Sequence, residues 1–139
     1  MENTLIKRGF ILAALMNFSV VVFSRGFTNT AINSADPVVM SNFGLLMIVM
    51  WGLAYLCIGL SNSSAKWISA VFAVEKLIYV VIWILWHSEN SVKAVYSEDI
   101  LAGVFYSIYG LNDLIFMIFF VWVFYLSSKN KDVLPSTST

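Results

Sequence analysis

Hydrophobic residues stand in four long runs separated by short polar segments. A helix that crosses the roughly 30 Å hydrocarbon core of a bilayer needs about 20 mostly apolar residues. The runs of suitable length lie at about 8–25, 38–60, 65–87 and 100–126. The pattern therefore predicts an all-α, polytopic membrane protein with four transmembrane helices, forming a single domain over residues 1–126.

The ends of these runs carry helix-boundary signals. Asp36 followed by Pro37 is typical of a helix start, and the acidic segment 97–99 precedes the fourth run in the same way. Trp67 and Trp86 bracket the third run, as interfacial aromatic residues do. The first run has a second interpretation, a cleaved signal peptide, although it is slightly long for one and no small-x-small cleavage site follows within 24–29.

Short connections between the runs predict an antiparallel bundle, and the charges predict its orientation. One side carries basic residues, and the other carries two basic residues together with four acids. The first set is Lys7, Arg8, Lys66, Lys129 and Lys131; the second is Arg25 and Lys93 with Asp36, Glu89, Glu98 and Asp99. The excess of Lys and Arg predicts that both termini are cytoplasmic. Residues 127–139 are expected to form a disordered cytoplasmic tail.

Composition narrows the function classes. Hydrophobic residues make up 60% of the chain, charged residues 12%, and the net charge is zero, with a mean hydropathy of +0.83. No basic stripe indicates a nucleic-acid partner, and the single cysteine, Cys57, excludes an intrachain disulfide. No metal or cofactor is predicted. No outward loop contains an Asn-x-Ser/Thr sequon, which is compatible with a bacterial inner membrane.

A register of 58 residues relates the two halves of the chain. It aligns Trp51-Gly52-Leu53 with Tyr109-Gly110-Leu111, and Asn17 with Glu75. This register suggests a tandem duplication of a two-helix hairpin, with chance similarity between apolar helices as the alternative. Glycines spaced seven apart would give two helices smooth strips for close packing; these are Gly52, Gly59, Gly103 and Gly110.

Three ionisable residues fall near the middle of predicted spans. Glu75 and Lys76 lie at the centre of the third run and Asp113 at the centre of the fourth, and Asn17 occupies the same depth in the first. A charge at the bilayer centre costs about 2.5–3.5 kcal/mol on insertion scales, so these groups are expected to face one another inside the bundle. Asn112, Tyr79 and Tyr109 are expected to contribute hydrogen bonds.

Two acids and one lysine leave one negative charge without a partner. A site of low dielectric constant resolves such an excess by protonating one acid or by holding a cation or cationic ligand. The same cluster can instead be a polar lock that only fixes how the helices pack.

One stretch resembles a known family. Ile11-Leu12-Ala13 and the segment Phe23-Ser24-Arg25-Gly26-Phe27-Thr28 look like the first helix of the small multidrug resistance transporters. The essential membrane glutamate of that family would fall on Ala14, so its proton and drug coupling is not carried over.

Three functional hypotheses follow. The first is a transporter-like or ligand-binding membrane protein with a proton- or cation-linked site, whose partners are the bilayer, protons and a small cationic or amphipathic ligand. The second is a non-enzymatic accessory or assembly subunit, in contact with a membrane partner protein or a second copy of itself. The third is an enzyme acting on a lipid-soluble substrate, which no nucleophile or metal spacing supports.

Overall fold

The computed structural model describes residues 2–61 and 65–129, and in these ranges every regular element is a helix. The side chains of residues 2 and 3 are not described. The expected tail therefore lies mostly outside the described residues, and its first three positions, 127–129, belong to the last helix. In chain order the helices are α1 (Glu2–Phe18), α2 (Val20–Phe23), α3 (Thr30–Ala35), α4 (Asn42–Leu60), α5 (Lys66–Glu89), α6 (Val92–Glu98) and α7 (Ile100–Lys129).

Four helical segments are long and apolar enough to cross a membrane, as the hydrophobic pattern predicted. They are Thr4–Phe23, which joins α1 to α2, and then Asn42–Leu60, Lys66–Glu89 and Ile100–Lys129. The remaining helices, α3 and α6, lie in segments that the sequence predicted only as connections, and they are too short to cross a membrane.

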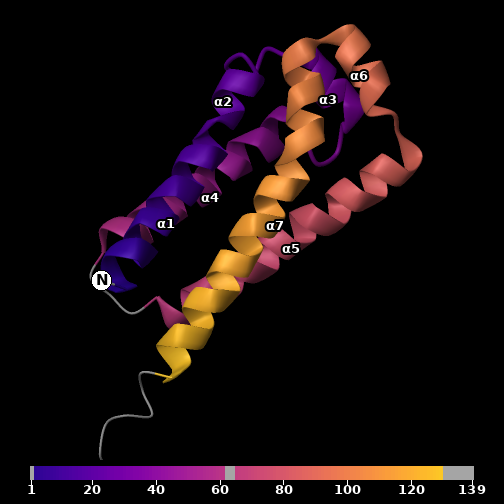
Figure 1. Ribbon diagram of the computed structural model, residues 1–139. Coiled ribbons are helices and arrows are strands. Elements are labelled where there is room, and N and C mark those ends of the chain that lie inside the picture. The colour runs from indigo at the N-terminus through magenta and orange to yellow at the C-terminus, as the bar shows by residue number, and fades with distance from the viewer. Residues whose placement is uncertain (1, 62–64, 130–139) are drawn as a thin grey trace, which may run out of the picture.

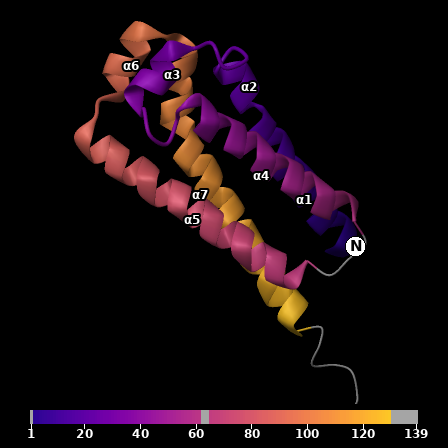
Figure 2. The same cartoon turned by 180° about the vertical axis from the view of Figure 1, so that it is seen from behind.

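The four long helices form two closely packed pairs. The most extensive contacts are between α1 and α4 and between α5 and α7. Contacts between the pairs are sparser and involve α7 with α1 and α2. We call the pair α1 and α4 the first hairpin and the pair α5 and α7 the second hairpin. Figures 1 and 2 show the two hairpins inclined to each other, with α3 and α6 covering one end and the N-terminus at the other. We call these ends the capped end and the terminal end.

The start of α4 differs from its expected position. The Asp36 carboxylate accepts a hydrogen bond from the backbone N–H of Val39 at 3.0 Å, but this stabilises only a single turn. The helix begins at Asn42, where the Ser41 hydroxyl caps it by accepting from the Gly44 N–H at 3.2 Å. The Asp-Pro signal therefore starts a turn rather than the spanning helix.

Two buried aromatic side chains hold α3 in place at the capped end. The indole N–H of Trp86 donates to the Ala35 carbonyl at 2.8 Å, and the Tyr106 hydroxyl donates to the Ile32 carbonyl at 2.8 Å. Ile32 is fully buried beneath them. These bonds attach the first connection to α5 and α7, so the capped end is continuous with the helical core.

Asp99 links the same connection to the start of α7. Its carboxylate accepts from the Ala102 N–H at 2.9 Å and from the Asn29 side-chain amide at 2.8 Å, and it pairs with Arg25 at 2.7 Å. The predicted capping role of Asp99 is thus confirmed. Arg25, Gly26 and Phe27 all have positive φ, and Gly26 is the residue among them that adopts this conformation without strain.

The apolar core consists of two clusters. One lies towards the capped end and includes Ile32, Met40, Leu45, Phe105 and Tyr106. The other lies towards the terminal end and includes Phe10, Ala14, Tyr55, Phe72 and Phe120. Buried polar side chains from the centres of the long helices lie between these clusters, so the fold places a polar layer inside an otherwise apolar bundle.

The predicted packing glycines lie against neighbouring helices. A Cβ at Gly52 would come within 3.1 Å of the Asn17 Cβ in α1, and Gly59 faces Phe10 of α1 at the same distance. Gly103 faces Tyr96 of α6, and Gly110 faces the Trp83 indole of α5. The glycines of α4 therefore permit close approach to α1, and those of α7 permit close approach to α5 and α6. The glycines of α4 and α7 do not face each other.

Replacing Gly110 with alanine should destabilise the second hairpin. The added methyl group would overlap the Trp83 ring, which is itself fixed by an indole bond of 2.7 Å to the Tyr106 carbonyl. Overpacking of this kind costs roughly 1–3 kcal/mol. We expect a clear drop in the melting temperature in detergent, whereas Leu111→Ala, at an exposed neighbouring position, should change it much less. Equal melting temperatures for both variants would contradict this packing.

Asp99 should make the capped end sensitive to acid. The pKa of Asp99 lies below the ordinary range because Ala102 and Asn29 donate to the carboxylate and Arg25 lies beside it. Its stabilising contribution is present above the unfolded-state pKa of about 4 and is lost as the pH falls through the folded-state value. The melting-temperature difference between the native chain and Asp99→Asn should therefore narrow below about pH 4. Glu98→Gln, at an exposed neighbour, should follow the native profile at every pH.

Candidate functional site

Every long helical segment contributes to the polar layer. Asn17 comes from α1, Tyr55 from α4, the adjacent pair Glu75 and Lys76 from α5, and Asp113 from α7. All five side chains are at least nine-tenths buried. The structure therefore brings together the midplane residues singled out from the sequence and adds Tyr55 to them.

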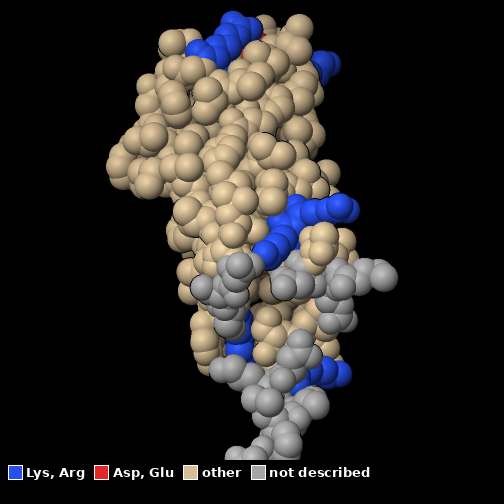
Figure 3. All heavy atoms as spheres, turned by 90° about the vertical axis from the view of Figure 1, so that its left-hand side faces the viewer, with Lys and Arg blue, Asp and Glu red and all other residues tan. Residues whose placement is uncertain are grey.

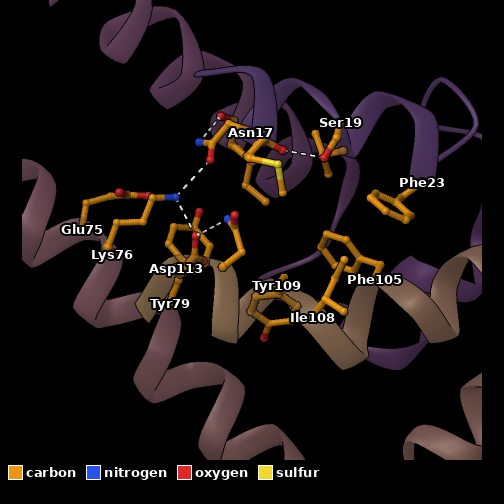
Figure 4. A pocket seen from close by; sticks show the side chains of 14 residues that line it. Asn17, Ser19, Phe23, Glu75, Lys76, Tyr79, Phe105, Ile108, Tyr109 and Asp113 are labelled. Atoms are coloured by element: carbon orange, nitrogen blue, oxygen red, sulfur yellow. Dashed lines mark hydrogen bonds and ion pairs between the residues drawn. The ribbon is translucent and has the colours of Figure 1, made fainter. Parts of the chain in front are cut away.

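Lys76 is the centre of this arrangement. Its Nζ donates to Asp113 Oδ1 at 2.6 Å and to Asn17 Oδ1 at 3.0 Å (Figure 4). The Asn17 amide in turn donates to the Ile48 carbonyl of α4 at 2.9 Å. Gly52, one turn after Ile48, permits the close approach of α1 that this bond requires. A single ammonium group thus joins α5 to α7 and, through Asn17, to the first hairpin.

Glu75 points to a different partner. Its Oε2 accepts a hydrogen bond from the Tyr55 hydroxyl of α4, and its Oε1 lies 4.0 Å from Lys76 Nζ. Adjacent helical positions are about 100° apart, so Glu75 and Lys76 leave α5 in different directions. Both are buried because their long side chains reach across to different helices. The ammonium of Lys76 also lies 5.3 Å from the centre of the Tyr55 ring, a cation–π distance.

The remaining predicted polar residues line the layer with fewer hydrogen bonds. The Asn112 amide donates to Asp113 Oδ1 at 3.3 Å. Tyr79 is half-buried, and no bond between its hydroxyl and a described carboxylate is present. Tyr109 is buried, and its hydroxyl has no hydrogen-bond partner in the described part of the chain. The donor to Glu75 is Tyr55. The position of Tyr55 inside an otherwise apolar helix is the sequence signal that could have indicated this role.

A pocket lies beside the polar layer, between α1–α2 and α7. Glu75, Lys76, Asp113 and Asn17 form its polar wall. The rest of its lining is largely apolar and aromatic and consists of Met16, Ser19, Val20, Phe23, Ile48, Tyr79, Phe105, Ile108, Tyr109 and Asn112. About 40 Å³ is open to the centres of water-sized molecules. Since one water needs roughly 10–15 Å³ by this measure, the pocket in this conformation fits a few waters or one small ion.

The pocket faces the surface where the two hairpins meet. Met16 and Ile108 are both partly exposed on that surface. The regular helix is interrupted there: Ser19 separates α1 from α2, and its hydroxyl donates back to the Met16 carbonyl at 2.5 Å. The polar layer therefore lies next to a seam between helices, on the side of the bundle rather than at its ends.

The described residues contain no cluster of three or more His, Cys, Asp or Glu side chains able to hold a metal ion. His87 packs against Trp83 near the capped end, with ring centres 4.4 Å apart, and lies away from the polar layer. Cys57 is exposed on α4 towards the terminal end.

Comparison with known proteins gives no match. No family model, no curated protein and no solved structure matches the chain.

Removing Lys76 should be more harmful than removing Lys76 and Asp113 together. Breaking a buried pair by deleting one partner costs about 3–5 kcal/mol, because the other charge stays buried without compensation. We expect Lys76→Met to lower the melting temperature in detergent strongly and the added change Asp113→Asn to restore part of it. If the stability loss of the double variant equals the sum of the losses in Lys76→Met and Asp113→Asn alone, the pair is not coupled.

Proposed function

We propose that this chain is a small multi-pass membrane protein whose buried polar layer binds a proton or a small cation, acting as a transporter or a ligand-binding protein. The observation that carries this proposal is the composition of the layer. Glu75 and Asp113 are buried with a single ammonium group, Lys76, and that ammonium lies much nearer to Asp113.

The surplus negative charge falls on Glu75. Asp113 receives the short bond from Lys76 and a second bond from Asn112, whereas Glu75 receives one from the neutral Tyr55 hydroxyl. An ionised carboxylate surrounded by apolar residues is costly unless a cation balances it. Proton or cation uptake at Glu75 therefore supplies the balance, and its release would alter the contacts between α4 and α5.

The pocket gives a bound species a place and a route. Its polar wall contains both acids, and its aromatic lining suits a cation. Its seam between α1–α2 and α7 would face the lipid rather than either aqueous side. A species larger than a few waters would need the Met16 and Ile108 side chains to move apart, so the amphipathic ligand considered from the sequence would require the hairpins to separate slightly.

We further propose an antiparallel bundle built from a duplicated hairpin. The register of 58 residues pairs Asn17 with Glu75, and it also pairs Tyr55 with Asp113. These four positions all lie in the polar layer, where Lys76 joins them. Duplication of one hairpin would explain why each long helix contributes one of these four matched positions to the polar layer.

The distribution of charge favours both termini in the cytoplasm. Lys7, Arg8, Lys66 and Lys129 lie at the terminal end, while at the capped end Arg25 is paired with Asp99. An excess of Lys and Arg on the cytoplasmic side is the usual determinant of orientation. A bacterial inner membrane is the location we propose.

A structural role is the second candidate, and one observation favours it. The Lys76–Asn17 and Tyr55–Glu75 bonds both connect the two hairpins, whose backbones approach each other at few positions, so the layer could serve only to lock them together in an accessory subunit. In that case Glu75 would hold its proton permanently and the pocket would have no occupant.

Infrared difference spectroscopy separates the two candidates. If Glu75 exchanges a proton, the purified protein in detergent should show a protonated-carboxyl band that grows as the buffer is acidified. Glu75→Gln should remove that band, and Glu89→Gln, at an exposed acid near the capped end, should keep it. A Glu75 band that persists unchanged from acidic to alkaline buffer would refute the proposal and support the permanently protonated lock.

A further inference from the structure

A second concave surface lies on the opposite side of the polar layer, towards the terminal end. It is a groove between α1 and α7, lined by Leu5, Arg8, Gly9, Leu12, Ile115, Phe116, Phe119 and Trp122. About 360 Å³ of it is open to the centres of water-sized molecules, far more than the pocket beside Glu75. Its lining is apolar except for Arg8. It shares Phe116 and Phe119 with the core cluster of the terminal end and shares no residue with the pocket.

The groove exists because the two hairpins approach each other only partly along this seam. Phe119 packs across Gly9, where even a Cβ would overlap its ring, and Phe10 packs on the inner side of Phe119 with ring centres 5.6 Å apart. Leu5, Leu12 and Ile115 stay largely exposed on the outer side of this contact. The contact thus closes the floor of the groove and leaves its outer side open along the helices.

Arg8 gives the groove a polar mouth at a defined depth. It lies nine residues before Asn17 in α1, which is about 13 Å along a helix. Half of a hydrocarbon core of about 30 Å is about 15 Å, so a polar layer at the midplane places Arg8 near the headgroup boundary. The exposed Arg8 side chain forms no ion pair with a described residue, and Trp122, a residue type typical of this boundary, lies on the facing helix.

The surrounding charge favours an anionic group at this mouth. Among the described side chains, the acids lie in the polar layer or towards the capped end, and Lys7, Lys66 and Lys129 share the terminal end with Arg8. Figure 3 shows one face of the molecule with Lys and Arg towards both ends and an uncharged band between them. Guanidinium groups bind phosphate with two parallel hydrogen bonds, and basic pockets between transmembrane helices are known to bind anionic lipid headgroups.

We propose that this groove is a binding site for one anionic phospholipid. Its phosphate pairs with Arg8, and one acyl chain lies along Leu12, Ile115 and Phe119 towards the polar layer. The lipid fills the part of the seam that the hairpins leave open at this groove and so stabilises their association. This proposal is independent of proton or cation binding at Glu75.

Native mass spectrometry of the protein in mild detergent tests the site directly. Phosphatidylglycerol should remain bound to the native chain in preference to phosphatidylcholine. Arg8→Gln should reduce phosphatidylglycerol retention about tenfold, the effect of losing one strong ionic contact worth about 1.4 kcal/mol. Lys66→Gln is the matched control, because Lys66 lies at the same end but outside the groove. This variant should retain as much phosphatidylglycerol as the native chain. Equal losses in both variants, or no preference between the lipids, would overturn the proposal.

Location is tested by quenching with phosphatidylglycerol brominated on its acyl chains. The bromine atoms should quench the fluorescence of Trp122. The part of the tryptophan fluorescence that the lipid quenches should therefore be smaller in Trp122→Phe than in the native chain. Arg8→Gln should weaken this quenching at low lipid concentration. Undiminished quenching in Arg8→Gln would show that lipid reaches the helix surface without recognition by Arg8, which contradicts the site.

Discussion

The bonds from the Lys76 ammonium group to Asp113 and Asn17 are the constraint on which the arrangement of the four long helices depends. Within each hairpin the helix backbones approach closely, whereas the two hairpins face each other mainly through large aromatic side chains such as Phe10, Tyr55 and Phe120. In hydrocarbon, apolar side chains gain little by leaving lipid for one another, so packing and hydrogen bonds determine helix association. One hydrogen-bonded cation reaching across that interface therefore has an influence that a surface ion pair in water would not have.

The polar layer also divides the apolar interior into two clusters with different surroundings. The cluster towards the capped end is enclosed by α3 and α6 and anchored by Trp86 and Tyr106, whose polar atoms bond to backbone carbonyls. The cluster towards the terminal end is rich in phenylalanine, and no short helix among the described residues covers it. A change in the protonation of Glu75 thus takes place between the capped-end cluster, which is held by hydrogen bonds, and the terminal-end cluster. The pocket beside Glu75 lies between the same two clusters.

The sequence alone predicted the four spanning segments because their length and hydrophobicity depend only on bilayer thickness. It also predicted which charged residues meet, since Glu75, Lys76 and Asp113 had to avoid lipid. It did not predict that Tyr55 is the donor to Glu75, because the choice among several tyrosines depends on how the helices are rotated. The α3 and α6 helices were missed for a related reason: contacts with distant elements fix these short segments. Bonds from Trp86 and Tyr106 hold α3, and α6 packs against α7. The Asp36-Pro37 signal starts a single turn, and the N-cap of α4 is Ser41.

The uneven division of charge between the hairpins has a consequence for biosynthesis. The first hairpin contains only Asn17 and Tyr55 in the polar layer, so it can enter the bilayer without burying an ion. The second hairpin contains both carboxylates and the lysine, and it emerges from the ribosome later. When the second hairpin partitions into lipid, the first hairpin is already in place with Asn17 and Tyr55 in the polar layer. The order of translation therefore supplies the Asn17 acceptor for Lys76 and the Tyr55 donor for Glu75 before these two charged residues enter the bilayer.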